Sequence, residues 1–134
     1  MQFIDLAAQR ARIGDRIDLA VSKVIREGKY ILGPEVAEFE RKLADYVGVK
    51  HVVACANGTD ALLIPLFAFG VGRGDAVFCP SFTFAATAEV VALAGAEPVF
   101  IDIDPDTYNI DIAQLKAASK AIKAEGRLTP KAII

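Results

Sequence analysis

A short polar segment follows an apolar stretch of the chain and has the residue types of an anion site. Asn57-Gly58-Thr59-Asp60 comes after the apolar residues Val52–Cys55 and before a run typical of a helix. The first backbone N–H groups of a helix lack partners within it, and the helix dipole adds positive character there. Gly58 allows close approach to the backbone, and Thr59 adds a hydroxyl donor. The segment favours a phosphorylated ligand, although many α/β domains turn in this way with nothing bound.

Two aromatic residues follow the next expected strand. Phe82 and Phe84 lie in the segment Pro80–Thr87, directly after a strand expected near 76–79. We expect one ring to enter the core and the other to face the crevice beyond the strand ends. A flat ring in that place could stack on a planar heteroaromatic cofactor. Packing in the core is the alternative for either ring, and Ser81 or Thr83 is expected to cap the following helix.

An acidic segment invites a calcium interpretation that its spacing contradicts. Asp102–Asp106 would begin an EF-hand loop, which requires glycine at its sixth position and glutamate at its twelfth. Thr107 and Ala113 stand there instead. We therefore expect a turn at Pro105-Asp106, with Asn109 or Asp111 capping the next helix.

The remaining reactive residues do not form a recognisable catalytic set. His51 is the single histidine, and its place at the start of an expected strand indicates a surface role. Cys55 and Cys79 lack the spacing of a metal site and are interpreted as reduced thiols in the core of a cytosolic protein. Neither a GxGxxG nor a Walker sequence is present, which weakens a nucleotide-binding interpretation.

The apolar pattern indicates the elements that would position these residues. Helical spacing predicts an amphipathic helix over roughly 9–27 and a second helix that begins at Pro34 and ends at Gly48. Short strands then alternate with helices, which predicts an α/β domain with a mostly parallel sheet and ligands at the carboxyl ends of its strands. Pro65 is expected to kink its helix, which would end near Phe69-Gly70. The strands are expected near 51–55, 76–79, 97–101 and 131–134, with helices over 59–69, 83–94 and 111–124 between them.

Composition limits the class of protein. Of the 134 residues, 54% are apolar, and the formal net charge is -2. The charge argues against a nucleic-acid surface, and the longest apolar runs are too short to span a membrane. The apolar excess, together with a strand that starts at Lys131, leads us to expect a fragment of a larger domain.

Four segments occur in an order that resembles the amino-terminal third of the DegT/DnrJ/EryC1/StrS aminotransferases. The resemblance covers essentially the whole chain. It implies a fold-type I enzyme that uses pyridoxal 5'-phosphate to aminate nucleotide-linked keto sugars. The segments are Tyr30–Val36, Ala56–Leu62, Pro80–Thr87 and Pro98–Pro105.

The resemblance also assigns roles to individual residues. The backbone amides of Thr59 and Asp60, with the Thr59 hydroxyl, would hold the cofactor phosphate, next to Gly58. Phe84 would stack on the pyridine ring, and Phe82 would face the core. Tyr30 would lie near the sugar end of the site. These assignments remain implications of the resemblance.

The family architecture implies a truncated three-layer α/β/α large domain. Residues 1–34 would form an amino-terminal helix and active-site loop, and residues 35–134 the first part of the cofactor domain. The Schiff-base lysine of the family lies further along the chain, so this segment would carry half a cofactor site. The complete protein would be a cytoplasmic homodimer that takes an amino group from glutamate. Alternatives are a sugar dehydratase of the same fold, a non-catalytic regulator and a flavodoxin-like binding module.

Overall fold

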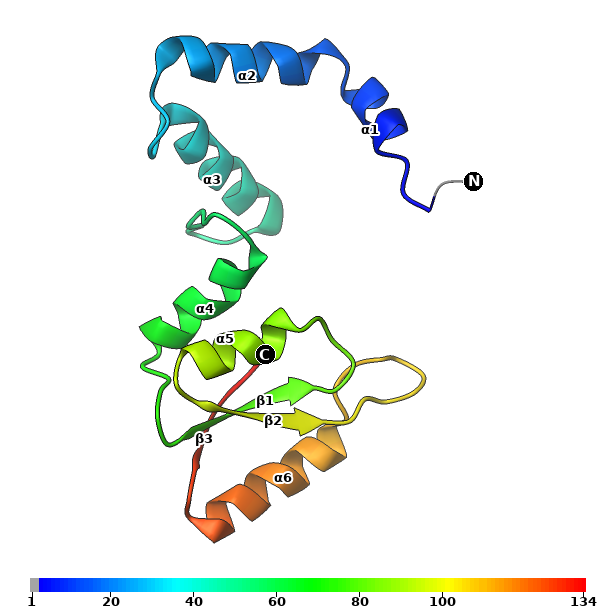
Figure 1. Ribbon diagram of the computed structural model, residues 1–134, viewed down its shortest axis with the longest axis vertical. Helices are drawn as coiled ribbons and strands as arrows, with labels where there is room; N and C mark the ends of the chain where they lie inside the picture. Colours follow the sequence, from blue (N-terminus) through cyan, green and yellow to red (C-terminus); the bar gives the residue numbers. More distant parts are fainter. Residues whose placement is uncertain (1–2) are drawn as a thin grey trace. The chain divides into compact units, whose positions relative to one another are not determined.

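The computed structural model describes residues 3–134 (Figure 1). The chain divides into two compact units, the first ending at Ala54 and the second beginning at Cys55. Within residues 3–134, no helix combines the length and the apolar character that crossing a membrane requires. The division expected from the family resemblance, between an active-site loop region over 1–34 and a cofactor domain from 35, stays a prediction.

The first unit contains three helices among its described residues: α1 (Leu6–Ile13), α2 (Asp15–Glu27) and α3 (Pro34–Val47). The prediction of one continuous helix over 9–27 is wrong. Gly14 separates α1 from α2 at φ 61° and ψ -148°, a conformation that residues with a Cβ rarely adopt. Pro34 occupies the first turn of α3, and Gly48 ends that helix in the left-handed conformation, as predicted.

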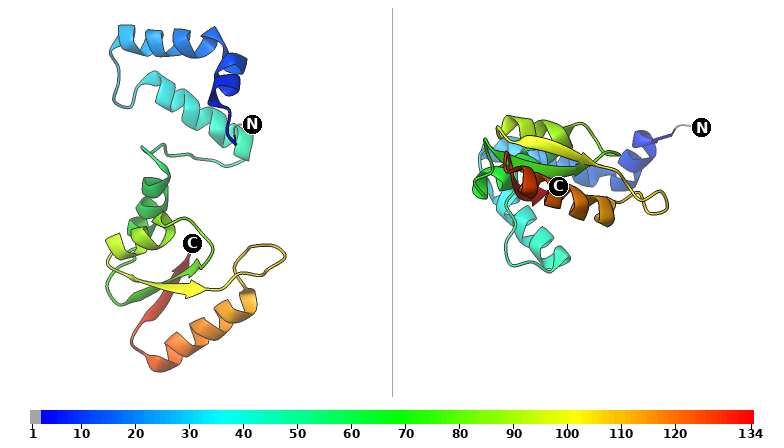
Figure 2. Two further views of the ribbon diagram at one scale, coloured as in Figure 1. Left: turned by 45° about the vertical axis from the view of Figure 1, so that its right-hand side comes forward. Right: turned by 90° about the horizontal axis from the view of Figure 1, so that it is seen from below.

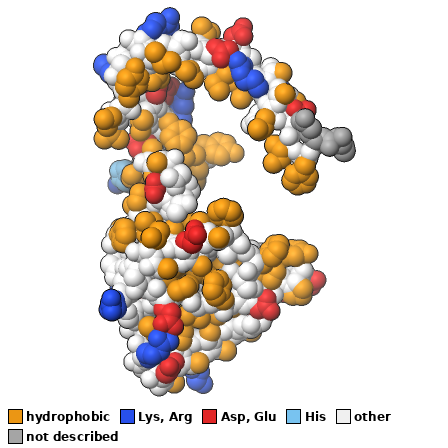
Figure 3. Space-filling model, in the orientation of Figure 1, with side chains coloured by type: hydrophobic (Ala, Val, Ile, Leu, Met, Phe, Trp, Pro, Cys, Tyr) orange, Lys and Arg blue, Asp and Glu red, His pale blue; other side chains and the backbone are white. Residues whose placement is uncertain are grey.

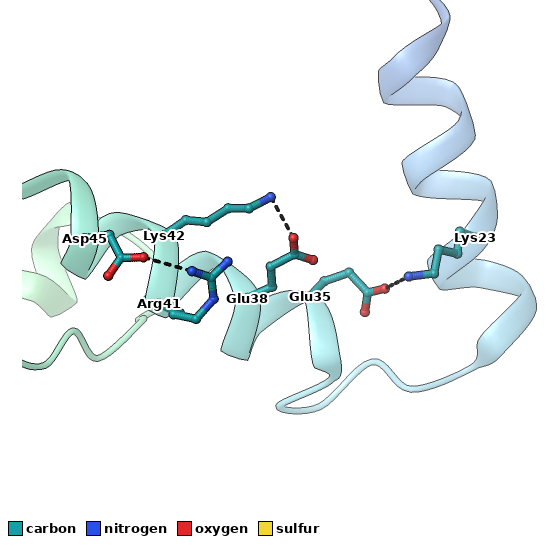
Figure 4. A network of polar contacts seen from close by, with 6 residues as sticks. All are labelled: Lys23, Glu35, Glu38, Arg41, Lys42 and Asp45. Atoms are coloured by element: carbon teal, nitrogen blue, oxygen red, sulfur yellow. Dashed lines mark hydrogen bonds and ion pairs between the residues drawn. The ribbon is translucent and has the colours of Figure 1, made fainter.

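Ion pairs join α2 to α3 and follow the surface of α3 (Figure 4). The Lys23 ammonium group donates to the Glu35 carboxylate at 2.8 Å. This contact raises the pKa of Lys23 and lowers that of Glu35. Two further ion pairs lie within α3, Glu38–Lys42 at 2.6 Å and Arg41–Asp45 at 2.8 Å. In each pair the two residues are one helical turn apart. All these groups are solvated, so their contribution to stability is small.

The second unit is a parallel three-stranded sheet with helices. Its elements are α4 (Gly58–Ala68), β1 (Asp75–Pro80), α5 (Ala86–Leu93), β2 (Glu97–Ile101), α6 (Ile112–Glu125) and β3 (Thr129–Ile133). The strand order is β2-β1-β3, with Phe78 opposite Val99 and Ile133. Pro98 and Pro130 lie in the outer strands, where a missing N–H is tolerated. The strands and helices predicted after residue 58 are confirmed, with shifts at their ends.

Helices cover both faces of this sheet (Figures 1 and 2). Val77 and Cys79, which project from one face of β1, belong to a buried cluster with Val90 and Val91 of α5 and Leu66 of α4. On the other face, Phe78 lines a groove with residues of α6 and β3. The expected three-layer α/β/α architecture is therefore confirmed. α4 continues through Pro65 and ends at Ala68, close to the predicted end.

The strand predicted over 51–55 is wrong. Residues 51–55 are irregular, and the Ala54 amide donates to the Glu40 carboxylate at 2.8 Å. A strand requires a hydrogen-bonding neighbour, and the three-stranded sheet of the described residues provides none for this segment. Cys55 is consequently exposed rather than part of the core, whereas Cys79 is buried as predicted. Both cysteines are free thiols, as predicted, and His51 is exposed.

Candidate functional site

The amino terminus of α4 is capped from within the chain. Asn57 has an extended backbone, and its side-chain oxygen accepts a hydrogen bond from the Asp60 amide at 2.9 Å. The Ala61 amide donates to the Asn57 carbonyl at 3.1 Å. Within the described residues, the amides of Gly58 and Thr59 find no acceptor. The donors open to a ligand are therefore those two amides and the Thr59 hydroxyl, because the Asp60 amide is engaged by the cap.

Gly58 is not explained by the fold of this chain. Its φ lies outside the left-handed region, and a Cβ built on it would meet no atom within 4 Å. Glycine within a helix costs stability, on the order of 1 kcal/mol relative to alanine. A methyl group at this position would stand beside the two free amides. That a phosphate group approaches the backbone at Gly58 stays a prediction.

Both aromatic rings after β1 are exposed. Phe84 is 80% exposed and Phe82 is 67% exposed, so the prediction that Phe82 faces the core is wrong. The buried positions at this end of the unit are taken instead by Ala86 and Val90 of α5. The Phe82 ring contacts Tyr108, with centroids 5.7 Å apart and planes inclined by 44°. Phe84 lies in the segment between the end of β1 and the start of α5.

The hydroxyl groups of Ser81 and Thr83 bond to other side chains and do not cap α5. α5 begins after Ala85 without a side-chain cap, so the prediction that Ser81 or Thr83 caps it is wrong. The Ser81 hydroxyl donates to Asp102 at 3.2 Å, and the Thr83 hydroxyl pairs with that of Thr87 at 3.0 Å. The first of these bonds links the segment after β1 to the segment after β2.

The acidic segment after β2 turns at residues 105–107, as predicted. The Asp104 carboxylate accepts from the amides of Asp106 and Thr107, at 3.0 and 2.8 Å, and from the Thr107 hydroxyl at 3.0 Å. These bonds hold the pKa of Asp104 below its ordinary value. Asp111 caps α6 by accepting from the amides of Ala113 and Gln114. Among residues 3–134, no group of three or more side chains could hold a metal ion.

Tyr30 lies in the loop between α2 and α3. Its hydroxyl donates to the Ile25 carbonyl at 3.1 Å, while most of the side chain is exposed. Leu32 has φ 48°, and a Cβ on Gly33 would collide with the Lys29 carbonyl oxygen. This loop conformation therefore requires glycine at residue 33. Contact between Tyr30 and a sugar substrate stays a prediction.

Two structural features near the candidate site were missed by sequence reasoning. The capping role of Asn57 could have been found, because asparagine directly before a helix start is a preferred cap residue. The contact of Tyr108 with Phe82 had no comparable signal, since Tyr108 has φ 59° and tyrosine rarely adopts that conformation.

These features define a class of protein. A parallel sheet between helical layers, a helix start with free amides and an exposed ring after a strand together characterise a ligand-binding α/β domain. A family model places the chain more narrowly: it belongs to the DegT/DnrJ/EryC1/StrS aminotransferase family, whose model matches residues 11–134.

Known relatives agree with this assignment. The chain is 59% identical over 118 residues to the UDP-2-acetamido-2-deoxy-3-oxo-D-glucuronate aminotransferase of Pseudomonas aeruginosa, covering 88% of this chain and 33% of that protein. A crystal structure of a DegT DnrJ EryC1 StrS aminotransferase from Brucella abortus matches with a TM-score of 0.96 and 70% identity, covering 99% of this chain and 36% of that one.

A more distant structure shares the same fold. DesV from S. venezuelae, solved in complex with a ketimine intermediate, matches with a TM-score of 0.85 and 32% identity, covering 98% of this chain and 33% of that one. The chain thus spans about a third of the length of these relatives.

Proposed function

We propose that the protein containing this chain is an aminotransferase that uses pyridoxal 5'-phosphate to aminate a nucleotide-linked keto sugar. The observation that carries the proposal is the 59% identity to an aminotransferase named for a UDP-linked 3-oxo-glucuronate substrate. The amino donor is proposed to be glutamate. Because the chain spans about a third of the length of its relatives, the proposal concerns a protein with the full length of the family members.

The free donors at the start of α4 fit the cofactor phosphate. The amides of Gly58 and Thr59 and the Thr59 hydroxyl would bind the phosphate oxygens, and the open space in front of Gly58 would admit them. The Asp60 amide would join them only after leaving Asn57. Phe84 would present its ring to the pyridine. When bound, pyridoxal phosphate supplies the electron sink that amine transfer requires.

The lysine that forms the covalent link with the cofactor is proposed to lie outside these residues. Lys116, Lys120, Lys123 and Lys131 are exposed and line the groove between α6 and β3. That groove lies on the sheet face that also bears Phe78, opposite the face covered by α5. A lysine there is remote from the start of α5, and an imine-forming lysine must be positioned and partly desolvated.

Further parts of the proposal concern partners and compartment. Tyr30 is proposed to contact the sugar end of the substrate, and the complete protein is proposed to act as a homodimer in the cytoplasm. The two free thiols are compatible with a reducing compartment.

The test uses the full-length protein with purified cofactor, glutamate and a UDP-linked 3-keto sugar. We expect visible absorbance from bound cofactor, loss of that absorbance with glutamate, and formation of an amino sugar. Thr59→Val should weaken cofactor binding, whereas Thr129→Val, at an exposed threonine of β3, should not.

The same experiment separates the alternatives. Loss of water from the sugar without gain of nitrogen would show a dehydratase. Failure to bind the cofactor at all would contradict the proposal and favour a regulatory or binding protein.

A further inference from the structure

Tyr108 has a backbone conformation that its residue type disfavours. Its φ is 59°, in the left-handed region where Cβ crowds the backbone and where glycine or asparagine is more usual. Leu32 is the other residue besides glycine with positive φ in the described part of the chain. A tyrosine at such a position needs surroundings that hold it and a reason to be there.

Hydrogen bonds within the loop over residues 102–111 hold Tyr108 in place. The Tyr108 amide donates to the Asp104 carbonyl at 2.8 Å, and the Asp104 amide donates to Asn109 at 2.9 Å. The base of the loop is closed by an antiparallel bridge between Ile103 and Ile110. The loop, drawn in yellow to orange, projects from the end of the sheet where β2 ends (Figure 1). These hydrogen bonds and the bridge restrain the backbone on both sides of Tyr108.

The side chain of Tyr108 contacts the segment that carries Phe84. Its ring lies 5.7 Å from that of Phe82, at an inclination typical of favourable aromatic pairs. A second link joins the same two segments, because the Ser81 hydroxyl donates to Asp102 at 3.2 Å. Apolar side chains gather on this end of the unit in the space-filling view (Figure 3).

Within the segment between β1 and α5, Phe82 has few other restraints. The Ser81 amide donates to the Ile101 carbonyl at 2.8 Å, which extends the pairing of β1 with β2 by one residue. In the part of the chain that the structure describes, the next three amides, of Phe82, Thr83 and Phe84, find no acceptor. Further along the segment, the Thr87 amide donates to the Phe84 carbonyl at 3.1 Å and the Thr83 hydroxyl pairs with that of Thr87 at 3.0 Å. Phe82 itself has no such bond within the described residues, so its ring contact with Tyr108 is its main restraint.

We propose that Tyr108 is a positioning residue whose ring fixes Phe82 and, through it, the direction of the Phe84 ring. The proposal rests on the proposed function, in which Phe84 stacks on the cofactor. It explains why tyrosine is present at a backbone position that favours glycine: the contact with Phe82 compensates for the unfavourable conformation.

The test compares Tyr108→Gly, Tyr108→Asn and Tyr108→Phe in the full-length protein. Glycine and asparagine suit the left-handed backbone but lack the aromatic ring, whereas phenylalanine keeps the ring. We expect the first two variants to weaken pyridoxal phosphate binding roughly threefold to tenfold, which is the worth of one aromatic pair. Their circular dichroism in the cofactor band should also fall. Tyr108→Phe should bind as the unchanged protein does.

A readout without cofactor separates this proposal from the proposed function. The Ser81 amide of the apoprotein donates to the Ile101 carbonyl, and its hydrogen exchange, followed by NMR, should accelerate in Tyr108→Gly and in Phe82→Ala and stay unchanged in Tyr108→Phe. Leu32→Gly is the matched control, since it also relieves a left-handed residue but lies in the first unit. If exchange accelerates in Tyr108→Gly but the unchanged protein does not bind the cofactor, the positioning role stands. That result would contradict only the proposed function.

Two results would overturn the positioning role. The first is unchanged exchange of the Ser81 amide in Tyr108→Gly. The second is a double variant, Phe82→Ala with Tyr108→Gly, whose loss of cofactor affinity equals the product of the two single losses, because residues acting through one contact are not additive.

Discussion

At Gly58, helix stability favours alanine, whereas the proposed phosphate site favours glycine. The chain itself offers space for a Cβ at this position, and alanine would favour the helix more than glycine does. The two free amides beside it are useful only if nothing blocks them. A residue that is unfavourable for folding and favourable for access is typical of a binding position.

Replacing Gly58 with alanine should therefore change two measurements in opposite directions. We expect the free energy of unfolding of the full-length protein in urea to rise, by at most about 1 kcal/mol, and its affinity for pyridoxal phosphate to fall. The reverse exchange, Ala61→Gly at an exposed position of the same helix, should lower stability and leave affinity unchanged. An alanine variant that keeps full affinity would show that no ligand approaches Gly58.

The two thiols should differ in reactivity. Burial raises the pKa of Cys79, which keeps it protonated and covered, whereas Cys55 is exposed. Iodoacetamide at neutral pH should modify Cys55 in the folded chain and modify Cys79 only after addition of urea, as mass spectrometry of the peptides would show. Modification of Cys79 at the same rate as Cys55 would contradict the buried position.

Individual residues were predicted less well than their neighbourhoods. The segments with Thr59 and Phe84 were identified from residue types, but the core positions assigned to Cys55 and Phe82 were wrong. An apolar side chain indicates that its burial is favourable, but it does not specify which helix, strand or loop of the fold would cover it. For Phe82 the deciding contact comes from Tyr108, 26 residues away in sequence, and no local pattern encodes it.

Helix ends and strand partners determined which elements were predicted correctly. The helices with clear caps, such as α6 with Asp111 and Gly126, were located to within about a residue or two of the expected positions. The helix over 9–27 was predicted as continuous because its apolar spacing continues across Gly14. The strand over 51–55 has the right composition, but a strand also needs a neighbour, which composition cannot supply.

The cap of α4 gives a prediction at this scale. Asn57→Ala removes the bond to the Asp60 amide and should destabilise the protein by about 1 kcal/mol in urea denaturation. Asn57→Asp should keep the stability, because aspartate is an equally good cap. It should nevertheless weaken phosphate binding, since it adds negative charge beside the free amides. Equal stability of the alanine variant would show that the cap contributes nothing.

The loop over residues 102–111 should open in acid. The bonds to Asp104 lower its pKa in the folded state, so the stabilisation they provide is complete above the ordinary value of 3.8 and disappears as the pH falls through the lower, folded value. Amide exchange at Asp106 and Thr107, corrected for the intrinsic effect of pH, should increase in that range. Asp104→Asn should remove the pH dependence, and a pH dependence that persists in it would assign the effect to another group.

At the scale of the molecule, the sheet and its core were predictable because they depend on repeated patterns. Val77 and Cys79 alternate with Ala76 and Phe78 along β1, and all four are buried because helices lie on both sides. Because several residues of each element carry the same pattern, a wrong prediction at one residue does not change the predicted element. The division of the chain after Ala54 had no equivalent signal, since it depends on the contacts of whole segments.

The core shared by α4, α5 and the sheet gives the largest expected loss of stability. Leu66→Ala removes a 4% exposed side chain from the buried cluster and should cost about 2–5 kcal/mol in the free energy of unfolding. Leu93→Ala, at an exposed position of α5, should change it by less than about 0.5 kcal/mol. Similar losses for both would show that the cluster does not carry the stability of the unit.

The strand order has a consequence for the time course of synthesis. β1 and β2 are neighbours in sequence and in space, joined through α5, so they can associate as soon as the ribosome has released them. The connection from β2 through α6 crosses β1 and brings β3 to the other edge of β1, and until β3 emerges that edge presents unpaired amides and carbonyls. Nascent chains halted before residue 129 should consequently attract chaperones more strongly than chains halted after β3 has left the exit tunnel.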